Sequence, residues 1–127
     1  MDYPFKDETH QIIGICMEVQ NTLGFGFSEV VYKDAMEIEF MDNSIPHLRE
    51  FPLHIVYKGK ELKRKFFVDF VCFDNIILEA KSSEKGIAND HISQVLNYLK
   101  ASGKTLALII NFGRRRLEFK RFIFSQS

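Results

Sequence analysis

The chain has 127 residues, 46% apolar and 27% charged, which suits one globular domain spanning residues 1–127. No apolar run approaches the roughly 20 residues needed to cross a bilayer, and the polar, acidic N-terminus is not a secretory signal, so we expect a cytoplasmic protein without membrane contact. The net charge of zero argues against strong non-specific binding of nucleic acid.

The first third of the chain predicts two helices. Apolar residues recur at helical spacing from Ile12 onward, and Gly24 is placed to end this first helix. Cys16 lies on its apolar stripe, and the only other cysteine is far away in an apolar strand, so two buried thiols are expected rather than a disulfide. Ser28 is a suitable N-cap for a second helix over about 29–41.

The middle of the chain is rich in β-forming residues that short turns interrupt. Three strands are expected, at 48–57, 61–73 and 76–81, with tight turns at 58–60 and 74–75. Because the turns are so short, consecutive strands should pair antiparallel.

The last third predicts a helix between two strands. The helix covers about 91–102 and ends at Gly103. The strand at 105–111 is almost continuously apolar, which favours burial on both faces and parallel pairing with the strand before the helix. A more polar strand is expected at 114–124. The whole order is ααβββαβ(β), an α/β fold.

Charge is distributed unevenly along the chain. Residues 1–50 hold three basic and ten acidic side chains, whereas residues 51–127 hold 14 and seven. The basic residues concentrate in two segments, one with Lys58, Lys60, Lys63, Arg64 and Lys65, the other with Arg114, Arg115, Arg116, Lys120 and Arg121. These segments are either solvated strand edges, which Lys and Arg protect from edge pairing, or two walls of a phosphate-binding groove.

Three polar residues interrupt the otherwise apolar central strands. Glu79 and Lys81 are two apart on one strand, so they point to the same face. Asp69 lies on the preceding strand, and a turn centred at 74–75 would place it opposite Ala80. The hairpin should therefore bring Asp69 next to both Glu79 and Lys81.

These residue types suit phosphodiester hydrolysis. Mg²⁺ is commonly held by one or two carboxylates, with water and substrate phosphate completing its coordination. The cation neutralises developing negative charge and acidifies a water, and a lysine beside that water can stabilise the transition state. The alternative is a simple ion-paired group on the surface, in which Asp69 and Glu79 contact Lys81.

Polar residues on both flanking helices could extend this site. Gln94 and Tyr98 are four apart, so they share one helix face and could contact phosphate or a metal-bound water. Glu29, in the first turn of its helix, could be a third carboxylate for the same cation. The alternatives are an ordinary amphipathic helix for the pair, and a favourable charge at the positive helix end for Glu29.

Five motifs in order resemble the GxxExxY protein family. They are GFSEVVY at 26–32, VDFV at 68–71, ILEAKS at 77–82, QVLNYL at 94–99 and LIINFG at 108–113. The resemblance covers roughly residues 8–124. It implies the PD-(D/E)XK nuclease superfamily and a restriction-endonuclease-like core, with a central mixed β-sheet flanked by helices.

The resemblance also implies roles for individual residues. Asp69 and Glu79 match the acidic metal ligands, Lys81 matches the catalytic lysine, and Glu29 matches the acidic residue of the first core helix. The Q-x-x-x-Y motif of the exonuclease-like branch is matched by Gln94 and Tyr98. Val68 stands where the family motif has proline, which is not a ligand.

We therefore expect a nuclease dependent on Mg²⁺ or Mn²⁺ that acts on DNA or structured nucleic acid. Weak, sequence-independent contacts to phosphate are expected from Lys63, Arg64, Lys65, Arg114, Arg115 and Arg116. The alternative is a non-catalytic or accessory module of the same fold. Such a module would act through a protein partner, or as a homodimer.

Overall fold

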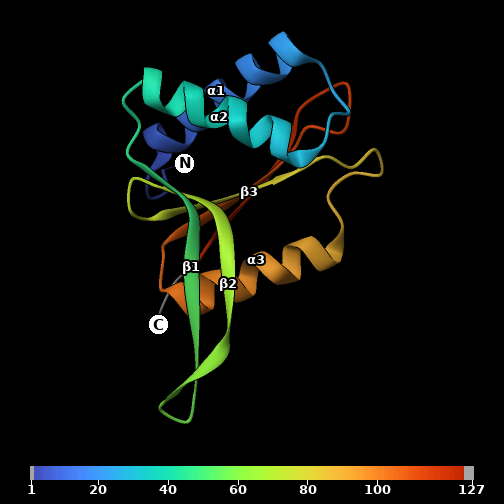
Figure 1. Cartoon of the computed structure of the whole chain (residues 1–127). Coiled ribbons are helices and arrows are strands. Elements are labelled where there is room, and N and C mark those ends of the chain that lie inside the picture. Colours follow the sequence, from blue (N-terminus) through green and yellow to red (C-terminus); the bar gives the residue numbers. More distant parts are fainter. Residues whose placement is uncertain (1, 125–127) are drawn as a thin grey trace.

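The computed structural model describes residues 2–124 of the chain (Figure 1). In that part of the chain the elements are α1 (Lys6–Leu23), α2 (Glu29–Asp42), β1 (His47–Tyr57), β2 (Lys60–Cys72), β3 (Ile76–Lys81), α3 (Asn89–Ser102), β4 (Leu106–Asn111) and β5 (Glu118–Ile123). The predicted α/β order, ααβββαβ(β), is confirmed.

The five strands form one mixed sheet in the order β1-β2-β3-β4-β5. Neighbouring strands are antiparallel except for β3 and β4, which are parallel from Ile76 paired with Leu106 to Lys81 paired with Asn111. Helix α3 makes the connection that parallel pairing requires. The predicted strand–helix–strand unit is therefore present.

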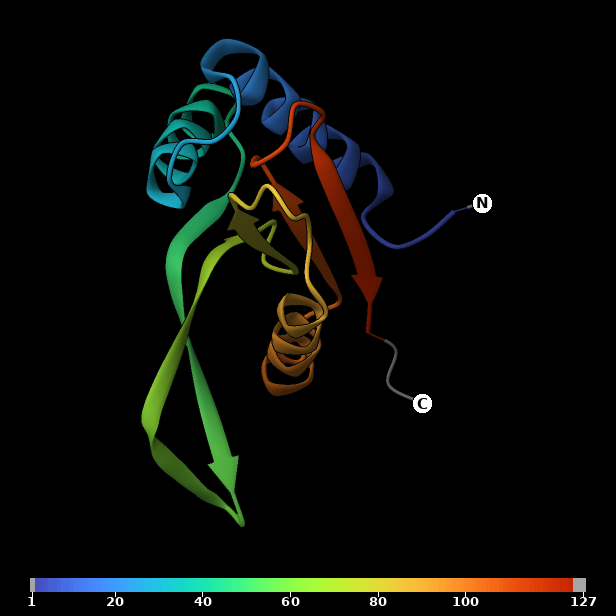
Figure 2. The ribbon, with the colours of Figure 1, turned by 90° about the vertical axis from the view of Figure 1, so that its right-hand side faces the viewer.

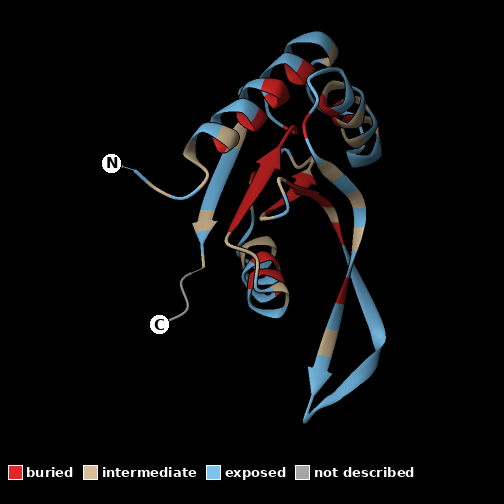
Figure 3. Cartoon of the chain, turned by 90° about the vertical axis from the view of Figure 1, so that its left-hand side faces the viewer, coloured by how far each residue is buried: buried red, intermediate tan, exposed pale blue. Residues whose placement is uncertain are grey.

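Helices cover both faces of the sheet. Figures 1 and 2 show α1 and α2 on one side and α3 on the other. Strands β3 and β4 lie between these layers, and every residue of β4 is buried (Figure 3). Burial on two faces explains why β4 is apolar from Leu106 to Ile110 rather than alternating.

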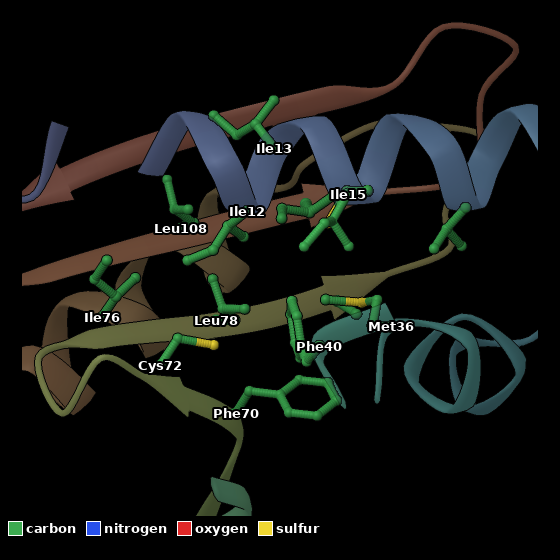
Figure 4. Packing of buried hydrophobic residues seen from close by; sticks show 14 of the residues in the cluster. Ile12, Ile13, Ile15, Met36, Phe40, Phe70, Cys72, Ile76, Leu78 and Leu108 are labelled. Atoms are coloured by element: carbon green, nitrogen blue, oxygen red, sulfur yellow. The ribbon is translucent and has the colours of Figure 1, made fainter. Parts of the chain in front are cut away.

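The larger core lies between the sheet and the N-terminal helices. Figure 4 shows Ile12 of α1, Met36 and Phe40 of α2, and Phe70 and Leu78 of the sheet packed together. Cys16 and Cys72 belong to the same cluster, and both are free and buried, as predicted. Burial raises the pKa of the Cys72 thiol to about 12, so it is an inert thiol. None of the helices within residues 2–124 is both long and apolar enough to cross a membrane.

The β1–β2 hairpin extends well beyond the rest of the sheet (Figures 1 and 3). Its two-residue turn is Lys58-Gly59, both with positive φ, which is the conformation that tight hairpins favour. Residues 60–67 of β2 are exposed throughout. This projection places a long strand pair next to α3, outside the core.

The last strand is shorter than predicted. It begins at Glu118, and Arg114 lies in a preceding loop that packs against the segment after β3. A side chain on Gly113 would overlap the Ser83 backbone, and the Arg114 Nε donates to the Glu84 carbonyl at 3.0 Å. Local β propensity at the start of this segment is therefore overridden by tertiary contacts.

Candidate metal centre

Asp69 and Glu79 are neighbours on adjacent strands: Glu79 shares the face of Ile77, which packs with residues of α3, whereas Asp69 also contacts Lys33 of α2. The ladder between β2 and β3 pairs Phe70 with Leu78, and continuing that register places Asp69 opposite Glu79. The predicted partner, Ala80, is wrong by one position. The correction brings the two carboxylates closer, because directly opposed residues share one face of a sheet.

Besides Glu79, the carboxylate of Asp69 contacts a backbone N–H and a lysine. Its Oδ2 accepts a hydrogen bond from the backbone N–H of Ala80 at 2.8 Å, where the regular ladder stops. Its Oδ1 lies 3.1 Å from the Nζ of Lys33, which also contacts Glu50 Oε1 at 2.8 Å. Burial opposes the charge of Lys33, yet Glu50 and Asp69 raise its pKa. Lys33 is therefore a permanent cation in the site.

Glu79 is more enclosed than a cleft residue would be. Its exposed fraction is 5%, so it is a buried acid and not part of a surface ion pair. Burial, the charge of Asp69 and a hydrogen bond with Asp69 raise the pKa of Glu79 to about 9, against the weaker opposing effect of Lys81 and Lys33. At neutral pH without a bound cation, Glu79 therefore carries a proton.

Lys81 and Tyr98 approach the carboxylates from the sheet and from α3. Lys81 is half-buried and shares the face of Glu79, as the spacing predicts. Burial raises the pKa of Tyr98, and the charges of Glu79 and Asp69 raise it further. The Tyr98 hydroxyl is thus a neutral donor near the two acids. Gln94 is exposed one turn earlier and lines the same groove as Tyr98.

The expected convergence of three carboxylates is absent. Within residues 2–124, no group of three or more His, Cys, Asp or Glu side chains is placed to hold a metal. Glu29 is exposed, and the α2 residue that contacts Asp69 is Lys33, one turn later. Sequence reasoning missed Lys33, although its position four residues after Glu29 puts both on one helix face.

The two predicted basic segments do not form walls of one groove. Residues 58–65 lie at the tip of the long hairpin, whereas residues 114–116 lie at the opposite end of the molecule (Figures 1 and 2). Arg114 is engaged by the Glu84 carbonyl and the Gly86 backbone, whereas Arg115 and Arg116 are exposed. The hairpin tip and the three arginines therefore do not face each other across one groove.

The donor set fits a hard divalent cation. Asp69 and Glu79 offer adjacent carboxylate oxygens, the ligand type that Mg²⁺ and Mn²⁺ prefer. The pKa of Glu79 is raised first by burial and then by the charge of Asp69, and Lys33 and Lys81 offset these effects only in part. A divalent cation would complete that compensation, with Asp69 and Glu79 as its protein ligands.

Comparisons with known proteins agree with this architecture. Residues 6–122 match the family model described as PD-(D/E)XK nuclease superfamily. The crystal structure of SSO0001 is similar at a TM-score of 0.60 and 18% identity, over 97% of this chain and 61% of that one. The chain thus spans less than two thirds of SSO0001. No curated protein matches the sequence.

Proposed function

The chain belongs to the PD-(D/E)XK nuclease superfamily, and on that premise we propose that it is a nuclease that hydrolyses phosphodiester bonds of DNA or structured nucleic acid with Mg²⁺ or Mn²⁺. The observation that carries the proposal is the pair of adjacent carboxylates, the buried Glu79 and the partly buried Asp69. Burying two acids side by side costs stability unless a cation joins them. The GxxExxY resemblance is consistent with this proposal and remains a prediction.

Each residue of the site has a role that its surroundings support. Asp69 is oriented by the Ala80 N–H and Lys33, so one carboxylate oxygen is fixed beside Glu79. When bound, the divalent cation would polarise the phosphate and lower the pKa of a coordinated water. Lys81 is placed to orient that water and stabilise negative charge. Tyr98 and Gln94 would donate hydrogen bonds to the substrate phosphate, whereas Glu29, exposed on α2, is given no role as a ligand.

Phosphate contacts away from the centre are proposed for exposed basic side chains. Lys63, Arg64 and Lys65 lie on the projecting hairpin, next to α3, and Arg115 and Arg116 lie at the other end. Such contacts position a nucleic acid without reading its sequence. Arg114 is not proposed as a phosphate contact, because its guanidinium already donates to the Glu84 carbonyl.

A nucleic-acid digestion assay tests this function with a variant in which a neutral side chain of nearly the same shape replaces Asp69. Asp69→Asn keeps an oxygen that can accept from Ala80, while it removes one carboxylate charge. We expect wild type to cleave single- or double-stranded DNA or RNA with Mg²⁺ or Mn²⁺, and Asp69→Asn to lose that activity. Asp74→Asn is the control, because Asp74 is an exposed acid in the β2–β3 turn. Equal cleavage by the Asp69 variant and wild type would reject the proposed site.

One observation supports the accessory-module alternative. Lys33 already contacts Asp69, so part of the charge that a metal would neutralise is neutralised within the chain. A module of this kind would keep the fold and act through a protein partner or a second copy. Absence of metal binding in wild type by calorimetry, together with absence of cleavage, would favour it.

A further inference from the structure

A groove lies between the β1–β2 hairpin and α3, next to the candidate metal centre. Its volume is about 720 Å³, within the range of about 300–1,000 Å³ typical of small-ligand sites. Its lining includes Phe66 and His54 of the hairpin and Gln94, Asn97 and Tyr98 of α3. The groove therefore combines aromatic surface with amide and hydroxyl groups.

We propose that this groove binds unpaired bases of a nucleic acid, stacked on the ring of Phe66, while the adjoining phosphate lies at the carboxylate pair. The inference deepens the proposed function, on which it rests, by assigning a single-stranded or frayed substrate. The groove volume suits a few unpaired nucleotides and cannot enclose a double helix.

The position of Phe66 supports stacking. Its ring centroid lies 6.2 Å from that of Tyr98, at an interplanar angle of 48°, and 39% of Phe66 is exposed. The ring is thus held by Tyr98 and still presents surface to the groove. Stacking of a base on such a ring is favourable for every base, because each has a π-face.

Tyr98 connects the groove with the metal centre. It lines the groove, and it packs in the same buried cluster as Ile77, which lies two residues before Glu79 on the same face of β3. A nucleotide whose base contacts Phe66 would thus have its backbone directed past Tyr98 toward Glu79 and Asp69.

Charge complementarity favours a nucleic acid as the occupant. Lys63, Arg64 and Lys65 immediately precede Phe66, and all three are exposed. Lys100 also lines the groove, whose acidic lining residue is Asp90. By strand alternation Arg64 shares the face of Phe66, so an aromatic ring and basic side chains, Arg64 and Lys100, lie at one groove, the combination that single-strand-binding sites use.

Phe67 provides a matched control. It follows Phe66 on β2 and is 53% exposed, but successive side chains of a strand point to opposite faces, and Phe67 does not line the groove. Phe66→Ala and Phe67→Ala remove the same ring from the same strand. Phe66→Leu keeps apolar volume at the groove without a ring, and serves if Phe66→Ala fails to fold.

The probe is a single-stranded oligonucleotide that carries 2-aminopurine, studied in EDTA so that no cleavage occurs. We expect wild type to change the 2-aminopurine emission and to bind this strand better than a duplex or a strand of abasic sites. Phe66→Ala and Phe66→Leu should weaken single-strand binding about fivefold or more and abolish the emission change, whereas Phe67→Ala should do neither.

Two results would overturn the inference. Equal losses in the Phe66 and Phe67 variants, or equal binding of the normal and abasic strands, would show that bases do not occupy the groove. Loss of a dimer in sedimentation, with unchanged oligonucleotide binding by Phe66→Leu, would assign the groove to a second copy of the chain. Since binding in EDTA does not depend on cleavage, this inference and the proposed hydrolysis can fail separately.

Discussion

The ammonium of Lys33 lies 3.1 Å from the Oδ1 of Asp69, and both side chains are largely enclosed, with exposed fractions of 15% and 14%. A residue of α2 thus neutralises a carboxylate of the sheet at the point where a divalent cation is proposed to bind. Lys33 also donates a hydrogen bond to Glu50, so it would keep one acidic partner if a cation displaced it from Asp69. Two expectations follow, for stability without metal and for metal affinity.

Replacing Lys33 by methionine should destabilise the metal-free protein and strengthen its binding of Mn²⁺ or Mg²⁺. The variant leaves Asp69 and Glu50 without their cation, which we expect to cost on the order of 2 kcal/mol in the free energy of unfolding. With that competing cation gone, metal affinity should rise about tenfold. Denaturation in EDTA and calorimetric titration measure the two effects.

Lys104→Met is the control for this variant. Lys104 is similarly enclosed, but it pairs with Asp74 in the β2–β3 turn, away from the carboxylate pair. The Lys104→Met variant should therefore bind metal with the same affinity as wild type. Weaker metal binding by Lys33→Met would mean that Lys33 organises the site rather than competing for it.

Asp69→Ala should be less stable than Asp69→Asn, although both remove the negative charge. Alanine leaves the Ala80 N–H without its acceptor, whereas the asparagine oxygen can still accept at that position. An unpaired buried N–H costs about 1–3 kcal/mol, which sets the expected difference in free energy of unfolding. Chemical denaturation in EDTA provides the measurement, and equal stabilities would show that the Ala80 hydrogen bond contributes little.

Wild type should lose stability as pH rises because Glu79 ionises, and Glu79→Gln should lack this loss. The native protein holds a proton on Glu79 up to a pKa of about 9, whereas the unfolded chain releases it near the ordinary value of 4.5. Between these values the native state binds more protons, so this group's contribution is complete below about 4.5 and is lost as pH rises toward 9. The slope is at most about 1.4 kcal/mol per pH unit.

Unfolding in EDTA at a series of pH values tests this expectation. The stability advantage of Glu79→Gln over wild type should grow from pH 5 to pH 9. Glu84→Gln, at an exposed acid, should follow wild type throughout. Parallel curves for wild type and Glu79→Gln would mean that Glu79 is ionised over the whole range.

The three consecutive arginines should separate into two kinds. Arg114→Ala should reduce stability, because it removes the hydrogen bond that the Nε of Arg114 donates to the Glu84 carbonyl at 3.0 Å. The double change Arg115→Ala, Arg116→Ala should leave stability within about 0.5 kcal/mol. If these two side chains bind phosphate, the double change should also flatten the plot of log binding constant against log salt concentration for a duplex. The magnitude of that slope should fall by about 0.9 for each phosphate that is no longer neutralised.

Binding isotherms at several salt concentrations measure that slope. An unchanged slope for the double variant would assign Arg115 and Arg116 to solubility. The same measurement on Lys63→Ala, Arg64→Ala, Lys65→Ala would then show whether the hairpin alone contacts phosphate.

The sequence by itself determined the elements and the faces of the site residues. Gly24 and Gly103 end helices where predicted, because left-handed or otherwise unusual backbone is accessible to glycine. The period of two along β3 places Glu79 and Lys81 on one face. These features depend on local geometry, which the order of residues specifies directly.

Only the tertiary structure decided which groups meet. The β2–β3 turn spans residues 73–75 rather than 74–75, and this one-residue difference moves the partner of Asp69 from Ala80 to Glu79. The packing of the helices on the sheet decides two further features. One is the contact of Lys33 with Asp69, and the other is the position of the projecting hairpin next to α3. Residues far apart in sequence come together through the summed packing of the whole core, and no local spacing encodes that sum.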